Sequence, residues 1–174
     1  MGQKAVFLDR DGVINDNVRP INKPDDLILF PGVGAAVKRL QDAGYRVFVV
    51  TNQGGVGLGY MTEEDLRSVH DKMIRELSRD GAVIDDIRYC SHRPHAGCGC
   101  RKPEPGMILE LASKYNIDLD QSFMVGDRDF DIQAGRRAGT RTVFIGKGHA
   151  DADLVAKDLT EAVNQILNQG VMNR

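Results

Sequence analysis

The sequence predicts an α/β protein in which helices cover both faces of a parallel β-sheet. Short runs of β-branched and aromatic residues alternate with segments whose apolar residues recur at helical spacing, and short loops join them. Three of the strand candidates end in polar loops that contain glycine. This alternation is typical of a parallel sheet buried on both sides, and it favours a Rossmann-like, three-layer α/β/α fold.

The first half of the chain is expected to contain two strands and two helices. Residues 4–12 form a buried strand that runs into an acidic loop, and a helix at about 34–43 ends at Gly44. Residues 45–55 form a second strand with a Gly-rich end. Thr62 is expected to cap the next helix, with Asp65 in the capping-box position, and this helix continues to about Arg79.

The second half repeats the alternation after an irregular loop at 92–106. The remaining strands are expected within 82–91, 122–127 and 140–146, and the remaining helices at 107–115, 129–138 and 158–168. Between Thr51 and Lys102 there is room for one helix, one strand and the loop, so no large cap domain is expected. Because no internal repeat or linker is seen, residues 1–174 are expected to form a single domain.

Composition excludes several classes of partner. The 23 basic and 25 acidic residues nearly cancel, which gives no reason to expect nucleic acid or an anionic membrane as a partner. No apolar run approaches the ~20 residues of a membrane span, and the first residues lack the pattern of a signal peptide. We therefore expect a cytoplasmic protein, and nothing in the sequence demands more than a monomer.

Four aspartates mark a candidate cation site. Asp9 and Asp11 lie at the end of the first strand, where alternate residues share a face, and Asp127 and Asp131 lie at i and i+4 at the start of a later helix. In parallel sheets ligands bind beyond the carboxyl ends of the strands, so these residues should converge. Taken singly, each aspartate could instead form an Asx turn or cap a helix. Together they would repel one another without a cation, and hard oxygen ligands suit Mg²⁺.

A second candidate metal site lies in the irregular loop. Cys90, His92, Cys98 and Cys100 offer three thiolates and an imidazole, a closed set that suits a structural Zn²⁺. The alternative is that Cys90 is a buried strand residue and that Cys98 and Cys100 are free thiols. The loop leads directly into Lys102, so the metal is expected to position that lysine. The remaining histidines, His70, His95 and His149, are expected to lie at solvated positions.

In its motifs the chain resembles the haloacid dehalogenase superfamily. The motifs are the apolar strand ending in Asp9-Arg10-Asp11-Gly12, Thr51 after the second strand, Lys102 before Pro103, and Gly126-Asp127 with Asp131. The resemblance implies that Asp9 attacks phosphorus and that Asp11 acts as general acid and base. It also implies that Thr51 and Lys102 bind the phosphoryl group. Mg²⁺ would be held by Asp9, Asp127 and the Asp11 backbone carbonyl, with Asp131 behind them.

Within the superfamily, the chain resembles a branch containing phosphatases of heptose 1,7-bisphosphate and of histidinol phosphate. The shared stretches are LDRDGxI, TNQ and CxH…CxCRKP, which do not separate the two. RKPEPGM and TNQGGVGLGYMTEEDL favour removal of the C7 phosphate of the heptose, a small sugar-phosphate partner. Substrate contacts are then expected from Asn52, Gln53, Arg101 and Arg128, although lysine is frequent at the last position. The alternatives are a histidinol-phosphate phosphatase, another small sugar-phosphate phosphatase, or a zinc-stabilised binding module. The binding module would lack the nucleophile, the acid or the lysine.

Overall fold

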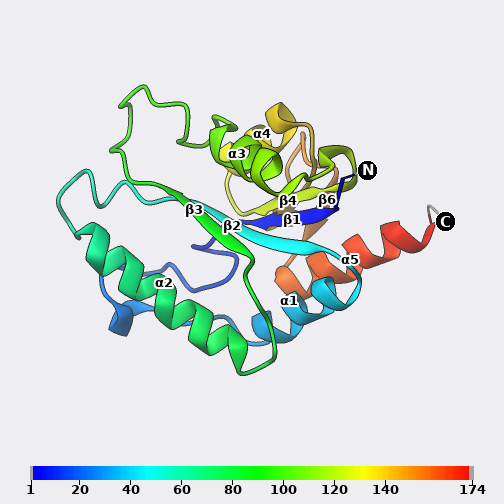
Figure 1. Cartoon of the computed structure of the whole chain (residues 1–174), viewed down its shortest axis with the longest axis horizontal. Helices are drawn as coiled ribbons and strands as arrows, with labels where there is room; N and C mark the ends of the chain where they lie inside the picture. The colour runs from blue at the N-terminus through cyan, green and yellow to red at the C-terminus, as the bar shows by residue number, and fades with distance from the viewer. Residues whose placement is uncertain (1, 173–174) are drawn as a thin grey trace.

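The computed structural model describes residues 2–172 and contains a six-stranded sheet in which every strand pair is parallel. The strand order is β3-β2-β1-β4-β5-β6 (Figure 1). The strands are β1 (Ala5–Leu8), β2 (Arg46–Asn52), β3 (Asp86–Cys90), β4 (Phe123–Gly126), β5 (Arg141–Ile145) and β6 (Leu154–Ala156). The helices are α1 (Val33–Asp42), α2 (Glu63–Ser78), α3 (Gly106–Tyr115), α4 (Asp129–Ala138) and α5 (Leu159–Met172), with short 3₁₀ turns η1 (Pro24–Asp26) and η2 (Leu119–Gln121).

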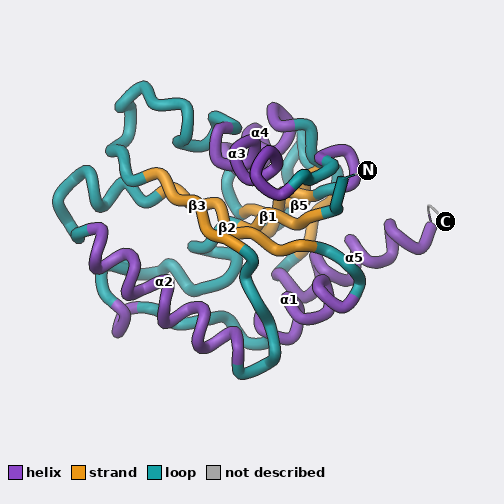
Figure 2. Tube along the Cα trace, viewed as in Figure 1, coloured by secondary structure: helices purple, strands orange, loops and turns teal. Residues whose placement is uncertain are grey.

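Helices cover the sheet on both faces, which confirms the three-layer prediction. Helices α1, α2 and α5 lie on one side, and α3 and α4 lie on the other (Figures 1 and 2). The two faces of β1 enter different apolar cores: Val6 and Leu8 pack on the side of α1, α2 and α5, whereas Ala5 and Phe7 pack on the side of α3. All four residues are fully buried, as expected for a central strand.

The chain changes direction across the sheet at β1. It passes from β1 to β2 and β3 on one side, and then crosses to β4, β5 and β6 on the other. The carboxyl ends of β2, β1 and β4 are therefore neighbours at a topological switch point, where open α/β sheets bind ligands. The Asp9 backbone N–H continues the pairing, donating to the Val125 carbonyl at 3.0 Å.

The predicted elements are present, with small shifts at their ends. Thr62 caps α2 in a reciprocal capping box with Asp65, at 2.9 and 3.0 Å. The strand expected within 82–91 begins only at Asp86, since the Asp85 carboxylate accepts a hydrogen bond from the Val47 N–H at 2.8 Å. The three-residue β6 and the two 3₁₀ turns were not predicted. Among residues 2–172, no helix combines the length and apolar character needed to cross a bilayer.

Candidate active site and metal centres

Three aspartates and a lysine form a charged cluster at the switch point, in which only Asp127 is partly exposed. Oxygen atoms of Asp9, Asp127 and Asp131 all lie within 4.8 Å of one another. The Lys102 ammonium donates to Asp9 Oδ1 at 3.0 Å, to Asp131 Oδ1 at 2.6 Å and to the Val50 carbonyl at 2.9 Å. Lys102 is only 2% exposed, so all three of its donors are used inside the protein.

The electrostatics of this cluster favour a bound cation. Burial would lower the pKa of Lys102, but the charges of Asp9 and Asp131 outweigh it and raise that pKa, which keeps the lysine charged. Burial and the charge of Asp9 raise the pKa of Asp127 to about 6. Asp127 Oδ1 is buried and has no hydrogen-bond partner. An unpaired carboxylate oxygen facing a second carboxylate fits a divalent cation such as Mg²⁺.

Asp131 lies on the expected helix, whereas Asp127 occupies a different position from the one expected. Asp127 precedes α4 in the strand-to-helix connection, so the prediction that both lie on that helix at i and i+4 was wrong for Asp127. The reason is that α4 begins only at Asp129, after Arg128 at its N-cap. Asp131 is fully buried and accepts from Lys102 and from the Arg128 N–H at 3.1 Å. Its oxygens are thus occupied by protein donors, which agrees with a supporting place behind the cation.

A glycine lets the two strand ends approach each other. Gly12 has φ +84°, and a Cβ at this position would collide with the Asp127 carboxylate. Gly12 therefore serves both the left-handed backbone and the close packing against the cluster. The glycine of the Asp9-Arg10-Asp11-Gly12 motif is thus explained by the position of a carboxylate more than a hundred residues later.

Asp11 lies at the edge of the cluster and is held by four hydrogen bonds. Its Oδ1 accepts from Arg10 Nε at 3.0 Å, Arg10 Nη2 at 2.9 Å and Asn15 Nδ2 at 3.0 Å. Its Oδ2 accepts from Gln53 Nε2 at 3.2 Å. Burial alone would raise the pKa of Asp11, but the Arg10 charge and these hydrogen bonds together lower it. A phosphate dianion placed beside it would act in the opposite direction and favour protonation.

The last two residues of β2 and Gln53 after them form the wall beside Asp11. Thr51 is buried, and its hydroxyl accepts from Gln53 Nε2 at 2.8 Å. The Asn52 side chain accepts from the Lys102 N–H at 2.9 Å and donates to the Lys102 carbonyl at 3.1 Å. Gln53 thus joins Thr51 to Asp11, and Asn52 fixes the backbone of the lysine. Both residues were predicted as substrate contacts, and their side chains already make these internal bonds.

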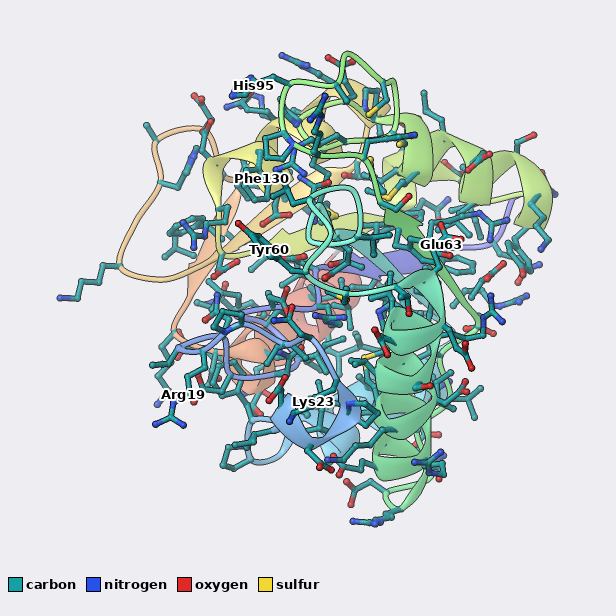
Figure 3. All side chains as sticks on the ribbon, turned by 90° about the vertical axis from the view of Figure 1, so that its left-hand side faces the viewer. Arg19, Lys23, Tyr60, Glu63, His95 and Phe130 are labelled. Carbon is teal, nitrogen blue, oxygen red and sulfur yellow. The ribbon has the colours of Figure 1, made fainter. Side chains whose placement is uncertain are left out.

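A cleft of about 390 Å³ opens above Asp9 and Asp11. Besides the two aspartates it is lined by Asn17, Arg19, Pro20, Ile21, Asn52, Asp127, Arg128 and Phe130. Figure 3 views this side of the molecule, with Phe130 and Tyr60 near the middle and Arg19 at the lower left. Arg128, predicted as a substrate contact, lines this cleft. Arg101 instead lines a neighbouring hollow of the cysteine loop, where its buried Nη1 has no hydrogen-bond partner.

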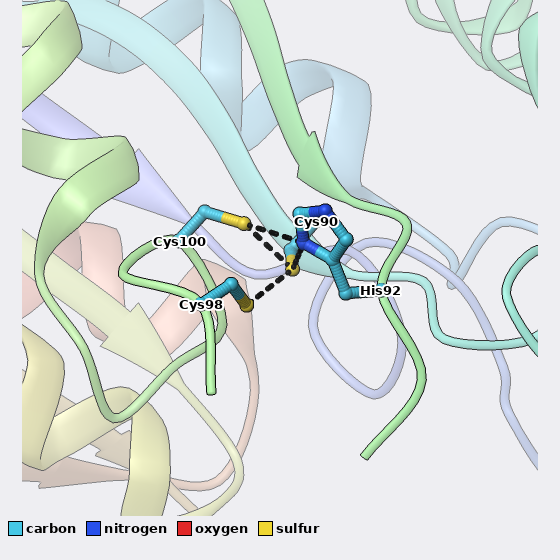
Figure 4. Close-up of side chains that lie close together, drawn as sticks. All are labelled: Cys90, His92, Cys98 and Cys100. Atoms are coloured by element: carbon cyan, nitrogen blue, oxygen red, sulfur yellow. Dashed lines mark hydrogen bonds between the residues drawn. The ribbon is translucent and has the colours of Figure 1, made fainter. Parts of the chain in front are cut away.

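The three cysteines and His92 converge as the sequence predicted (Figure 4). The Cys90 sulfur lies 2.8 Å from that of Cys100 and 3.6 Å from that of Cys98. His92 Nδ1 lies 3.4 Å from the Cys90 sulfur and 3.2 Å from the Cys100 sulfur. No disulfide joins the cysteines. Burial and the neighbouring thiols raise the pKa of Cys100 to about 12, because clustered thiolates repel one another. The donor set therefore fits a Cys₃His metal site.

This second cluster supports the first through the backbone. Cys90 is buried at the end of β3, whereas His92, Cys98 and Cys100 lie on the loop that also carries Lys102. The loop has no regular secondary structure between Cys90 and α3. A metal bound to the four side chains would therefore fix the segment from which Lys102 enters the buried cluster.

Sequence reasoning missed a buried pair below Asp11. His70 was expected at a solvated position, and this was wrong: it is 5% exposed, and its Nε2 lies 3.0 Å from Arg10 Nη1. Arg10 is fully buried. One signal was available, since residues alternate across a strand end and a side chain between Asp9 and Asp11 must point away from the cluster. Its partner could not be found, because sixty residues separate the two.

The other two histidines lie near the surface. His95 is exposed, as predicted, and has a positive φ of 64°. His149 is partly buried and pairs with the Asp129 carboxylate at 2.7 Å.

Comparison with known proteins agrees with this geometry. Residues 99–169 match the family model of HAD-hydrolase-like proteins. The chain is 42% identical over 178 residues to D-glycero-beta-D-manno-heptose-1,7-bisphosphate 7-phosphatase of Haemophilus ducreyi, covering 94% of this chain and 98% of the relative. It is 39% identical over 158 residues to D-glycero-alpha-D-manno-heptose-1,7-bisphosphate 7-phosphatase of Photorhabdus laumondii, covering 86% of each.

A solved structure is similar along nearly its whole length. It is the D,D-heptose 1,7-bisphosphate phosphatase from B. bronchiseptica complexed with magnesium and phosphate. The TM-score is 0.88 and the identity 36%, over 95% of this chain and 99% of the other. Magnesium in that relative agrees with the carboxylate cluster described above. The chain belongs to the D-glycero-D-manno-heptose-1,7-bisphosphate 7-phosphatase family of haloacid dehalogenase-like phosphatases.

Proposed function

We propose that this protein hydrolyses the C7 phosphate of D-glycero-D-manno-heptose 1,7-bisphosphate, giving heptose 1-phosphate and inorganic phosphate for nucleotide-activated heptose biosynthesis. The observation that carries the proposal is near full-length similarity to phosphatases of that name in a chain that keeps the whole charged cluster. The residues to which the proposal gives the roles of nucleophile, acid, lysine and metal ligands lie together at the carboxyl ends of the strands. A binding module that had lost catalysis would lack one of them.

In the first step, an oxygen of Asp9 attacks phosphorus. A bond forms between that oxygen and phosphorus, and the bond between phosphorus and the C7 oxygen breaks. Asp11 gives its proton to the departing oxygen, so heptose 1-phosphate leaves as a neutral alcohol at C7. The Lys102 ammonium pairs with Asp9 before attack, 3.0 Å from its Oδ1, and together with the Thr51 hydroxyl it offsets charge on the transferring group.

In the second step, water releases the phosphate. Asp11, now a carboxylate, accepts a proton from water as the water oxygen attacks the phosphorus of the aspartyl phosphate. The bond between Asp9 and phosphorus breaks, which regenerates both carboxyl groups and yields inorganic phosphate. Gln53, bonded to both Thr51 and Asp11, holds the phosphate-binding hydroxyl and the base in register.

The two clusters would hold different metals. Asp9, Asp127 and the Asp11 backbone carbonyl would hold Mg²⁺, with Asp131 behind them, and the ion would supply charge neutralisation at the phosphoryl oxygens. Cys90, His92, Cys98 and Cys100 would hold Zn²⁺ as a closed structural site. Free thiols in such a site suit a reducing compartment, which supports a cytoplasmic location for this protein. We propose that it acts as a monomer.

Substrate selection would come from the cleft wall. Arg128 and Arg19 line the cleft with Phe130, so a second phosphate bound there can meet positive charge. We propose that Arg128 binds the C1 phosphate, with Arg101 contributing from the neighbouring hollow. The side chains of Asn52 and Gln53 hold neighbouring site residues in place through their internal hydrogen bonds, and we propose that they also contact the substrate.

Phosphate release with Mg²⁺ tests the proposal. The α- and β-anomers of heptose 1,7-bisphosphate would be compared with histidinol phosphate and with a panel of sugar phosphates. A kcat/KM for one heptose anomer well above all the others supports the proposal and identifies the anomer. A preference for histidinol phosphate would keep the mechanism and overturn the substrate. No phosphate release from any substrate, with both metals bound, would favour a binding module.

A further inference from the structure

Below the cleft, a second layer of buried polar side chains supports Asp11. Arg10 is fully buried, and a guanidinium has five N–H donors and no acceptor. Two of its donors meet Asp11 Oδ1. A third, on Nη1, meets His70 Nε2 at 3.0 Å. His70 therefore occupies the end of the guanidinium that points away from the active site.

This contact determines the state of the histidine. Because Arg10 can only donate, His70 Nε2 must accept, and the ring is the neutral tautomer with its proton on Nδ1. A protonated imidazole would have no acceptor for Arg10. Burial, followed by the Arg10 charge, lowers the pKa of His70 to about 3, in agreement with that assignment. The ring packs beside Tyr89 of β3, with ring centroids 6.1 Å apart.

The contact also affects which oxygen of Asp11 can carry a proton. Oδ1 already accepts three hydrogen bonds, two from Arg10 and one from Asn15. Oδ2 accepts only one, from Gln53. The proton that Asp11 transfers is therefore held on Oδ2. That arrangement depends on the guanidinium staying in place, and without His70 its Nη1 would be a buried donor with no acceptor.

We propose that His70 is a positioning residue for the acid–base step, acting through Arg10 to keep Oδ1 of Asp11 occupied and Oδ2 presented to the leaving group. This inference rests on the proposed function, since it assigns a support to the acid of that reaction. It places a determinant of the chemistry on α2, an element that contributes no residue to the lining of the cleft.

The test compares two leaving groups in single-turnover experiments with Mg²⁺. Loss of the sugar from heptose 1,7-bisphosphate requires protonation of an alkoxide, whereas p-nitrophenolate leaves without it. His70→Leu should slow the first turnover of the sugar substrate at least about tenfold, with KM little changed. The same variant should leave the first burst of p-nitrophenol release from p-nitrophenyl phosphate within about twofold of wild type.

Two further variants separate positioning from general damage. His70→Gln has an oxygen that can reach Arg10 and should restore most of the sugar-phosphate rate. Val69→Ala, a fully buried neighbour on the same helix, removes packing without touching Arg10 and should affect both substrates equally. If His70→Leu does not fold, His70→Asn replaces it. Its side chain is polar but shorter than that of Gln, and the expected rates are those given for His70→Leu.

Equal losses on the two leaving groups, or a His70→Gln variant as slow as His70→Leu while fully folded, would overturn the inference. The wild-type rates test the proposed function separately. A wild type that prefers another alkyl phosphate contradicts the heptose substrate, and the leaving-group comparison is then made with that alkyl phosphate.

Discussion

The two candidate metal centres are linked by Lys102, which follows Cys100 by two residues and bonds to Asp9 and Asp131. They are nevertheless built in opposite ways. The carboxylate cluster lies on the ends of central strands, and Asp9, Lys102 and Asp131 are at most 5% exposed. The Cys₃His cluster has one buried member, Cys90, and three partly or fully exposed members on an irregular loop. The sheet holds the first set of ligands in place, whereas the second set must hold its own loop in place.

Because of this difference, losing one site should have other consequences than losing the other. Removing a carboxylate should change the chemistry and leave the fold, because two apolar cores support the strands independently. Removing a thiolate should change the stability of the loop first and the chemistry second, through the placement of Lys102. Variants of each site test this contrast.

Asp9→Asn should have the largest effect. An amide cannot form the aspartyl phosphate, so we expect phosphate release to fall by at least about 1,000-fold while the melting temperature stays near that of wild type. Asp129→Asn, a nearby exposed carboxylate paired only at the surface, is the matched control and should retain activity. A nearly normal rate for Asp9→Asn would exclude this residue as nucleophile.

Gly12→Ala should weaken the carboxylate site. The new methyl group would meet the Asp127 carboxylate, and displacement of a metal ligand should reduce the Mg²⁺ affinity by about 10–100-fold. Gly139→Ala is the control for backbone strain alone, since Gly139 has φ +99° with open space around it. Titration of activity with Mg²⁺ measures the effect. Equal shifts in the two variants would mean that strain, and not contact with Asp127, is responsible.

Cys98→Ser should remove the second metal and cost stability. We expect the zinc content to fall from one ion per chain to nearly none, and the free energy of unfolding to drop by roughly 2–4 kcal/mol. That loss corresponds to a melting temperature lower by about 5–15 °C. Activity should fall only severalfold. Metal analysis and calorimetry provide the measurement, with Ser91→Ala in the same loop as control. An unchanged zinc content and melting temperature would contradict the closed site.

Replacing His70 should have the smallest effect, which is a change in how the free energy of unfolding depends on pH. Its pKa is about 3 in the folded protein and 6.5 as the unperturbed value, so between these values the unfolded chain binds a proton that the folded chain does not. Its stabilising contribution is therefore complete above pH 6.5 and decreases as pH falls towards 3, by roughly 1–2 kcal/mol at pH 5.

Denaturant unfolding of wild type and His70→Gln over this range checks the sign. The advantage of wild type over the variant should shrink with acid, because glutamine does not titrate, and acid effects on the other groups are common to both proteins. An advantage that grows as pH falls would mean that His70 is charged in the folded protein and that the tautomer assigned above is wrong.

Much of the fold and of both clusters could be predicted from the sequence, because their signals are local. The strand of Ala5–Leu8 leads directly into Asp9, and the spacing of Cys90, His92, Cys98 and Cys100 is that of a metal loop. Strand β6 could not be predicted, since three residues carry too little periodicity. The start of β3 at Asp86 depends on a side chain–backbone bond to a different strand.

The errors in the site have the same origin. The partner of Arg10 could be known only after α2 had been packed against the sheet, and the use of the Asn52 amide only after the cysteine loop had returned to β2. A sequence reveals which groups the chemistry needs at the strand ends. It does not reveal which distant side chains occupy their remaining hydrogen bonds.

We hold that the carboxylate cluster carries the chemistry and that Asp9 is the nucleophile. Locating the phosphoryl group on the protein tests this directly. Asp11→Asn, which lacks the base for the second step, would be mixed with p-nitrophenyl phosphate and Mg²⁺, quenched in acid and analysed by peptide mass spectrometry. We expect one phosphoryl group on the peptide containing Asp9 and none on that peptide in the Asp9→Asn, Asp11→Asn double variant. A phosphoryl group on another residue, or p-nitrophenol release from the double variant at the rate of the single one, would contradict it.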